Sequence, residues 1–355
     1  GTCVLAGLLP AWRATRVDLN AEFQGGTRNP GGSRSRLGKT LLVVQVTLSI
    51  VLLIGAGLFG RTLRNLQNVD VGFNREQLLV LELTARPPTY DRAGAVALHQ
   101  RVVDRIGTIP GVRRATFSRM PLLTGGAWGT AIRIPGRTSA PAGRPDSALL
   151  NAVDAAFFST FEIPLLLGRA FTRRDDASAP KVAIVNEAAV RQYFGGENPV
   201  GRRIGRPSQN GNVDLENVGV VRDAKYASVK SRAPATVYLP FPQEPEGAVN
   251  YAVRTMGDPE AMLAAIRTAV REIDPNLPLG NVRTQAAQSD QLFASERLFA
   301  RFASFFGGLA LLLVCVGLYG LMSYAVTRRT GEIGIRIALG ALPRRVLWMV
   351  LRESL

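Results

Sequence analysis

The sequence predicts an α+β membrane protein in which two transmembrane helices flank an extracytoplasmic domain made of a split βαβ subdomain with an inserted, mostly β subdomain. Three observations predict this fold. Two long runs of residues carry no charge, basic residues lie on the outer side of each run, and the two ends of the intervening loop repeat one βαβ pattern. Together they indicate one folded domain between two membrane spans.

The two uncharged runs are long enough to cross a bilayer. Residues 40–60 include LLVVQVTLSIVLLIGAGLF, and residues 302–327 include GGLALLLVCVGLYGLM. A helix of about 20 apolar residues matches a hydrocarbon core of about 30 Å. The alternative is a buried helix of a globular domain, but such helices rarely lack a polar stripe over this length. We therefore expect two transmembrane helices, and the helical spacing of apolar residues at 61–73 and 291–301 predicts that stalk helices continue them outward.

Basic residues predict the orientation of the spans. Lys39 and several arginines precede the first span, and Arg328 and further arginines follow the second. Short cytoplasmic segments of membrane proteins are rich in Lys and Arg, whereas long loops cross the membrane whatever their charge. We expect residues 1–39 and 328–355 to be cytoplasmic and residues 61–301 to be periplasmic, in a bacterial inner membrane.

The loop between the spans contains two similar halves. The first, residues 74–118, has the strand-like runs QLLVLELT and VRRATFS on either side of a helical pattern. The second, about residues 248–290, repeats the order with NYAVRT, a helical pattern and NVRT. Residues 119–247 form the expected insert, in which KVAIVN, NVGVV and TVYLP are typical of strands. Two facing βαβ halves predict an α/β sandwich from which the insert projects.

Composition excludes several classes of site. The chain has 355 residues and a formal charge of +16, but its basic residues outside the loop lie beside the spans, which argues against a nucleic-acid partner. The only cysteines are Cys3 and Cys315. A disulfide scaffold and a thiolate metal site are therefore both excluded.

One short motif resembles part of a phosphate-binding loop. Gly38, Lys39 and Thr40 supply its last three residues, but Ser33 stands where the first glycine is needed. The segment also leads into a membrane span instead of following a buried strand. We expect Lys39 to anchor the span on the cytoplasmic side, with no nucleotide bound.

The loop offers no catalytic constellation. His99 is the only histidine and lies in a helical pattern without a nucleophile motif, so we expect a surface or half-buried position for it. Asp175 and Asp176 follow two arginines, which favours a solvated turn over a cation site. We expect no cofactor, no metal and no enzymatic activity.

Four motifs carry a resemblance that covers nearly the whole chain. GEIGIRIALGA follows the second span, and the loop contains GRAFTRRDD, VAIVNEAAVRQYFGGENPVGRRIG and NVGVVRDAKY. With the large domain between two spans, these motifs resemble the MacB/FtsX-type ABC-transporter permeases, in the branch with a duplicated permease. LLPAWRATRVD, at residues 8–18, is similar to the end of a preceding permease helix. Residues 328–355 would then begin a permease domain of which the remaining spans lie outside this sequence.

The resemblance implies a function in transport. Family members carry no ATPase in the permease segment itself, and the resemblance implies that a cytoplasmic ATP-binding subunit supplies the energy that moves the periplasmic domain, for efflux or for release of envelope substrates. The lipid bilayer, a second permease half or a homodimer, and a periplasmic protein are the other expected partners. Two spans around a periplasmic domain are also the plan of a sensor or receptor, which is the alternative function.

The segment after the second span is expected to couple the ATPase to the permease. Ile333 and Ile337 share one face of a predicted helix, with Glu332 and Arg336 beside it. An amphipathic helix of this kind could also rest on anionic lipid. The resemblance favours a coupling helix, in which Glu332, Ile333, Arg336 and Ile337 contact the ATP-binding subunit.

Overall fold

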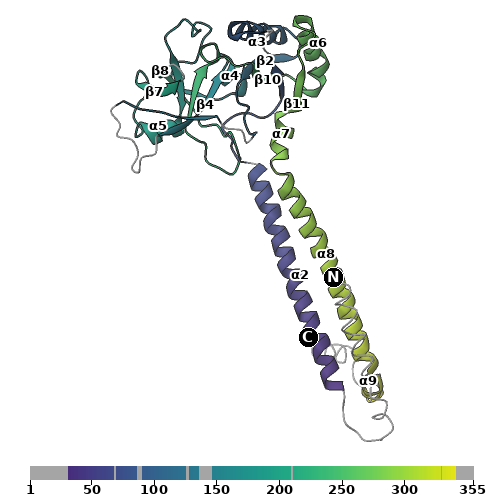
Figure 1. Ribbon diagram of the computed structural model, residues 1–355. Helices are drawn as coiled ribbons and strands as arrows, with labels where there is room; N and C mark the ends of the chain where they lie inside the picture. Colours follow the sequence, from purple (N-terminus) through teal and green to yellow (C-terminus); the bar gives the residue numbers. More distant parts are fainter. Residues whose placement is uncertain are drawn as a thin grey trace. The chain divides into compact units, whose positions relative to one another are not determined.

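The computed structural model describes residues 31–67, 69–85, 90–124, 128–135, 146–208, 211–328 and 330–340. The chain divides into two compact units, which are described separately (Figure 1). The helical unit is formed by the chain up to Leu58 and from Arg301 onward, and the globular unit is Phe59–Ala300.

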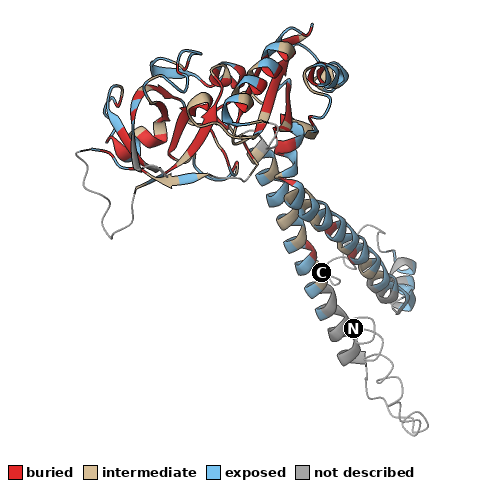
Figure 2. Ribbon diagram, turned by 45° about the horizontal axis from the view of Figure 1, so that its top comes forward, coloured by how far each residue is buried: buried red, intermediate tan, exposed pale blue. Residues whose placement is uncertain are grey.

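Two long helices form most of the described part of the helical unit. They are α2 (Gly31–Gln67) and α8 (Ala294–Arg328), and a short helix α9 (Thr330–Ala338) follows. The apolar stretches Val43–Leu66 and Ala294–Gly320 are long enough to span a membrane. The predicted spans at 40–60 and 302–327 fall within these helices, and most of their large apolar side chains are exposed (Figure 2).

The two long helices approach closely at one glycine. A Cβ atom on Gly307 would lie 3.2 Å from Cδ2 of Leu53, which is too tight for a side chain without movement of the leucine. Small residues allow such contacts between membrane helices. At Gly55, Gly57, Gly60, Gly308 and Gly320 a Cβ atom would lie in open space.

The predicted stalks are shorter than expected on one side and interrupted on the other. Helix α2 ends at Gln67 instead of continuing to residue 73. Before α8, helix α7 (Gln285–Gln291) forms a separate element, because the chain turns at Leu292 and Phe293. Only the segment from Ala294 therefore continues the second span.

One sheet runs through the globular unit. Its strands follow the order β11-β1-β10-β2-β4-β9-β6-β8-β5, with β3 paired to β4 and β7 paired to β8. The strands are β1 (Leu78–Thr84), β2 (Val112–Ser118), β3 (Gly129–Ala131), β4 (Ser147–Val153), β5 (Leu165–Gly168), β6 (Val182–Asn186), β7 (Arg203–Ser208), β8 (Gly211–Val221), β9 (Thr236–Pro240), β10 (Ala248–Thr255) and β11 (Leu279–Thr284). The strands predicted from QLLVLELT, VRRATFS, NYAVRT, KVAIVN, NVGVV and TVYLP are all present.

The two βαβ halves interleave in this sheet. Strands β1 and β2 come from the first half, β10 and β11 from the second, and the four pair antiparallel in alternation. Helices α3 (Arg92–Gly107) and α6 (Leu263–Ile273) pack together, and their apolar faces join the strands in one core. Asp91 begins α3 by accepting a hydrogen bond from the backbone N–H of Gly94. The prediction that the halves pack into one subdomain is confirmed.

The insert continues the same sheet. Strand β4 pairs with β2 at one position, Ser118 opposite Val153, and then pairs in parallel with β9. Two short helices, α4 (Phe157–Phe161) and α5 (Glu187–Tyr193), cover parts of the insert, and the 3₁₀ turns Phe241–Gln243 and Glu260–Met262 complete the unit. The continuous sheet shows no boundary between the βαβ halves and the insert. The limits expected for the insert, residues 119–247, therefore remain a prediction.

A buried arginine joins the parts of the globular unit. Arg254 on β10 is 2% exposed, and its guanidinium donates hydrogen bonds to the carbonyl oxygens of Thr160 (2.7 Å), Glu76 (2.9 Å) and Asn74 (3.0 Å). The Glu162 carboxylate lies 3.5 Å away. These contacts connect the second βαβ half, helix α4 of the insert and the segment between α2 and β1.

Replacement of Arg254 by methionine should destabilise the globular unit. The substitution keeps an apolar side chain but removes every donor to the three carbonyl oxygens, and loss of a buried charged donor costs about 3 kcal/mol or more. Thermal unfolding of the purified protein in detergent measures the effect. The control is Arg203→Met, on an exposed strand position. Equal unfolding temperatures for both variants would contradict the role given to Arg254.

Candidate functional site

The candidate functional site is the part of the globular unit where both long helices end. Leu63 and Leu66, from the last turns of α2, pack against the same apolar cluster as Leu292 and Phe293, which precede α8. Phe293, directly before the first residue of α8, is 2% exposed, so it anchors the start of α8 in the core. We call this region, formed by residues 59–74 and 285–300 with their contacts inside the globular unit, the junction.

The segment that leaves α2 has a fixed path. Gly72 has a φ of 84°, and a Cβ atom there would lie 1.7 Å from the carbonyl oxygen of Asp223, so only glycine fits. The backbone N–H of Lys225 donates to the carbonyl of Val71 (3.0 Å), and that of Asn74 donates to the carbonyl of Phe161 (3.0 Å). A shift of this end of α2 would therefore disturb the insert at two places, near Lys225 and at the end of α4.

The segment that leads into α8 is bound to the insert through helix α7. The side-chain amides of Gln285 and Gln288 both donate to the carbonyl oxygen of Leu122, at 3.3 and 2.5 Å. Both glutamines are buried, so their hydrogen bonds are made in a region of low dielectric constant. The Thr284 hydroxyl begins α7 by accepting from the N–H of Ala287 (3.1 Å). The base of α8 is thereby attached to the loop that follows β2.

Ion pairs surround the junction. Arg222 contacts Asp70 (2.7 Å), Arg297 contacts Asp290 (2.6 Å) and Lys230 contacts Glu296. All three pairs are at least partly exposed, and such pairs contribute about 0 to 1 kcal/mol each. They orient the helix ends, whereas the apolar cluster and the buried amides hold them.

The four residues expected to contact an ATP-binding subunit lie on helix α9. The backbone of Glu332, Ile333, Arg336 and Ile337 is helical, but their side chains lie outside the described residues. The structure therefore leaves their role as a prediction. Gly340, with a φ of 89°, follows the end of the helix in the left-handed conformation typical of a helix terminus.

Helix α9 has a second apolar side that the sequence analysis missed. Ile335 is 64% exposed and Leu339 is 82% exposed, and the two are one helical turn apart. They lie away from the face that Ile333 and Ile337 share. The i, i+4 spacing of Ile335 and Leu339 is present in the sequence, but the sequence analysis considered only the face of Ile333 and Ile337.

His99 is fully buried, and the expected surface or half-buried position was wrong. Its ring packs between Phe117 and Phe241, with centroid distances of 5.5 and 5.7 Å, and Nδ1 lies 2.8 Å from the hydroxyl of Tyr251. Burial lowers the pKa of His99 from 6.5 to about 4. The imidazole is therefore neutral at pH 7 and belongs to the core of the βαβ halves.

The two adjacent aspartates have different environments. Asp175 is 6% exposed and accepts two hydrogen bonds of 2.8 Å from the guanidinium of Arg169, which hold the pKa of its carboxyl below the usual value. The expectation of a solvated turn was wrong for this residue and is met by Asp176, which accepts from Ser178. Within the described part of the chain, no three His, Cys, Asp or Glu side chains gather as metal ligands.

The partial phosphate-loop motif is helical. Gly38, Lys39 and Thr40 belong to α2, which begins at Gly31. Inside a helix the backbone N–H groups bond to preceding carbonyls and are not free to bind phosphate. The backbone conformation therefore supports the sequence analysis, which assigned no nucleotide to this segment.

Comparisons with known families cover most of the chain. Residues 40–273 match the MacB-like periplasmic core domain, and residues 304–355 match the FtsX-like permease C-terminal domain. The first match includes the whole insert and α2 from Thr40, and the second begins within α8 and includes α9.

Individual relatives are distant. The chain is 25% identical over 363 residues to the pyoverdine export ATP-binding/permease protein PvdT of Pseudomonas putida, with 97% of this chain and 50% of that protein covered. It is 23% identical over 290 residues to the macrolide export ATP-binding/permease protein MacB of Marinobacter nauticus, with 71% and 43% covered. The chain thus spans about half the length of the curated relatives it matches.

A solved structure also matches the globular part. The periplasmic region of MacB from Actinobacillus actinomycetemcomitans aligns with a TM-score of 0.42 and 12% identity, over 63% of this chain and 95% of that one.

The buried histidine should make stability depend on pH. The unfolded chain binds a proton at His99 near pH 6.5, whereas the folded protein does so only near pH 4. The contribution of neutral His99 is therefore fully present above pH 6.5 and is lost as the pH falls toward 4. When the pH falls from 7 to 4.5, the free energy of unfolding should decrease in both proteins. The decrease should be about 2 to 3 kcal/mol larger in the natural protein than in His99→Gln. Unfolding at both pH values measures this, and parallel losses in both proteins would rule out the assignment.

Proposed function

The chain belongs to the MacB/FtsX family of ABC-transporter permeases, and on this premise we propose that it converts ATP hydrolysis by a cytoplasmic ATP-binding subunit into movement of its periplasmic core domain. The proposal assigns residues 61–301 to the periplasm and the two spans to a bacterial inner membrane. The chain itself performs no chemistry in this scheme. It transmits motion between two compartments.

The continuity of the two long helices is the observation that carries the proposal. Helix α2 contains an apolar stretch long enough to span a membrane and ends at Leu66 and Gln67, beside the core cluster of the globular unit. Helix α8 begins directly after the buried Phe293 and runs through the second stretch to Arg328. An unbroken helix transmits displacement along its axis, so movement at the cytoplasmic ends would reach the junction.

The relatives suggest the class of transport. The proteins of Pseudomonas putida and Marinobacter nauticus are named as exporters of pyoverdine and of macrolides. We propose efflux, or release of envelope substrates, for the present chain. The expected assembly includes a second permease half or a second copy of this chain, and a periplasmic protein that receives the substrate.

The alternative function, a two-span periplasmic receptor, is less well supported. A receptor would continue after its second span into a signalling helix or a kinase. In this chain, residues 304–355 match an FtsX-like permease domain at that position. The match favours a permease that continues into further membrane spans.

The coupling role is proposed for α9. Glu332, Ile333, Arg336 and Ile337 would dock into the ATP-binding subunit and pass its closure to α8. Gly331 and Gly334 support close docking because a Cβ atom at either position would lie in open space, where a partner could approach the backbone. Glycine inside a helix costs about 1 kcal/mol of helix stability relative to alanine. A helix that rests on lipid gains nothing in return for this cost, whereas a docked helix gains close contact.

The proposed topology can be tested by labelling. In a variant without the natural cysteines, a cysteine at Ser178 should react with an impermeant maleimide added to intact spheroplasts, and a cysteine at Ser35 should react only after the membrane is opened. Ser178 is in the globular unit, and Ser35 lies in α2 before the apolar stretch. Labelling of both positions from the same side would end the two-span arrangement.

The proposed coupling role of α9 can be tested by substitution. Ile333→Asp should place a charge on the docking face of α9, so that the ATP-binding subunit no longer co-purifies and stimulation of ATP turnover in reconstituted membranes falls at least tenfold. Ile335→Asp is the matched control, because Ile335 carries the same side chain on another side of the helix and is 64% exposed. Membrane insertion should be normal in both. If Ile333→Asp behaves like the unmodified chain, α9 does not carry the coupling.

A further inference from the structure

A polar pocket of about 790 Å³ lies in the globular unit beside the junction. Its walls come from the segment after α2, from helix α5, from the chain after β8 and from the loop before β9. Asp70 and Gly72 belong to the wall that follows α2, and Lys230 on the loop contacts Glu296 in the first turn of α8. One wall of the pocket is therefore the segment that follows α2, and another wall is linked to α8 through Lys230.

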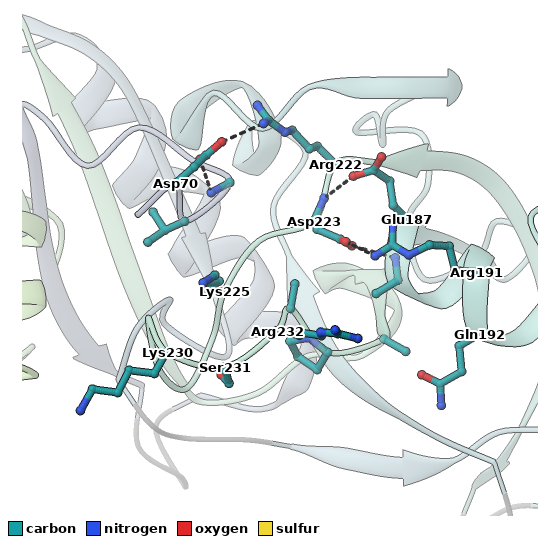
Figure 3. Close-up of a pocket in the computed structure, with 16 residues that line it drawn as sticks. Asp70, Glu187, Arg191, Gln192, Arg222, Asp223, Lys225, Lys230, Ser231 and Arg232 are labelled. Atoms are coloured by element: carbon teal, nitrogen blue, oxygen red, sulfur yellow. Dashed lines mark hydrogen bonds and ion pairs between the residues drawn. The ribbon is translucent and has the colours of Figure 1, made fainter. Parts of the chain in front are cut away.

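All three carboxylates that line the pocket are already occupied. Asp70 accepts from Arg222 (2.7 Å), and Asp223 accepts from Arg191 (2.5 Å) and from the backbone N–H of Ala188 (2.7 Å). Glu187 accepts from the backbone N–H of Asp223 (3.1 Å). These contacts, drawn as dashed lines in Figure 3, fix the walls: two of the carboxylates are paired with arginines, and Glu187 is bound to a backbone N–H. The lining holds five basic side chains against these three carboxylates.

Two cations of the pocket have no acidic partner among the described residues. Lys225 donates one hydrogen bond to the carbonyl of Val229 (2.5 Å) and keeps two free donors, and the guanidinium of Arg232 makes no hydrogen bond or ion pair. Both lie in the middle of the view in Figure 3. A concave surface that holds uncompensated positive charge is suited to an anion.

A third cation is held in reserve. Lys230 extends away from the middle of the pocket in Figure 3, and its ammonium group contacts Glu296. The lysine side chain is 53% accessible and the glutamate side chain is 24% accessible, so the lysine end of the pair lies within reach of a soluble ligand. An anion in the pocket would compete with Glu296 for Lys230, and binding would thereby release a contact to the first turn of α8.

We propose that this pocket binds a phosphate-bearing anion, with Arg232 and Lys225 as the principal donors and Lys230 as a donor shared with Glu296. A tetrahedral phosphate accepts hydrogen bonds from several directions, which suits a guanidinium and two ammonium groups on different walls. The phosphate could belong to a lipid headgroup or to a soluble compound. The ligand chemistry rests on the pocket alone, and only the link to helix movement rests on the proposed function.

Binding to the full chain in a neutral detergent tests the proposal. Titration calorimetry at constant ionic strength would use sn-glycerol 3-phosphate as the soluble probe and phosphatidylglycerol in mixed micelles as the lipid probe. Binding of both probes, or of one, supports the site and identifies the source of the phosphate. Binding of neither overturns it. No ATP-binding subunit is present, so this result is independent of the coupling experiment.

Variants connect any binding to the pocket. Arg232→Gln and Lys225→Gln should each weaken binding about tenfold or more, because each removes a charge-assisted hydrogen bond. Arg174→Gln is the control for loss of one exposed positive charge outside the pocket and should bind as the natural protein does. Glu296→Gln should bind about threefold more tightly, because it frees Lys230. Equal weakening by Arg232→Gln and Arg174→Gln, or weaker binding by Glu296→Gln, would refute the assignment.

Discussion

The guanidinium of Arg254 is the interaction on which the globular unit depends. It is a buried cation on β10 that donates to three backbone carbonyls, one from α4 and two from the segment between α2 and β1, so it can be satisfied only when both segments are in place beside the strand. A buried donor left without acceptors costs more than most apolar contacts contribute. Arg254 therefore requires the sheet, helix α4 and the segment after α2 to form together.

That requirement explains how two membrane helices share one domain. The chain leaves α2 through residues that Arg254 helps to fix, and it reaches α8 through α7, which is bound to the loop after β2. Both routes cross the same apolar cluster. The globular unit accordingly holds the two helix ends as one body, which is the property that a domain moved by its stalks needs.

Sequence patterns predicted the elements that repeat a simple period. The two spans follow from length and lack of charge. The helices α3 and α6 follow from helical spacing, and strand-like runs indicated β1, β2, β6, β8, β9, β10 and β11 but not β3, β4 or β5. Helices α4 and α5 were missed because elements this short carry too few turns for a pattern to appear.

Polar residues inside the core were the other failure. His99, Asp175 and Arg254 are all buried, although the sequence analysis expected a surface or half-buried position for His99 and a solvated turn for Asp175, and gave Arg254 no separate role. Each bonds with partners far along the chain or across a turn, and composition cannot show such partners. The pocket beside the junction was unpredictable for the same reason. Arg232 and Lys225 are distinguished by the lack of an acidic partner among the residues that the structure describes, and only the folded structure shows which cations have one.

The antiparallel pairing of β1 with β11 has a mechanical consequence. Leu79, near the start of β1, pairs with Thr284, at the end of β11, so the connections to α2 and to α8 leave from the same end of two adjacent strands. Force applied along these two strands in opposite directions would load the pair in shear, which its hydrogen bonds resist together. Force that separates the strands at the end that carries both connections would load the bonds singly, beginning at that end. The strand pair is thus stiff toward sliding along the strands and compliant toward separation.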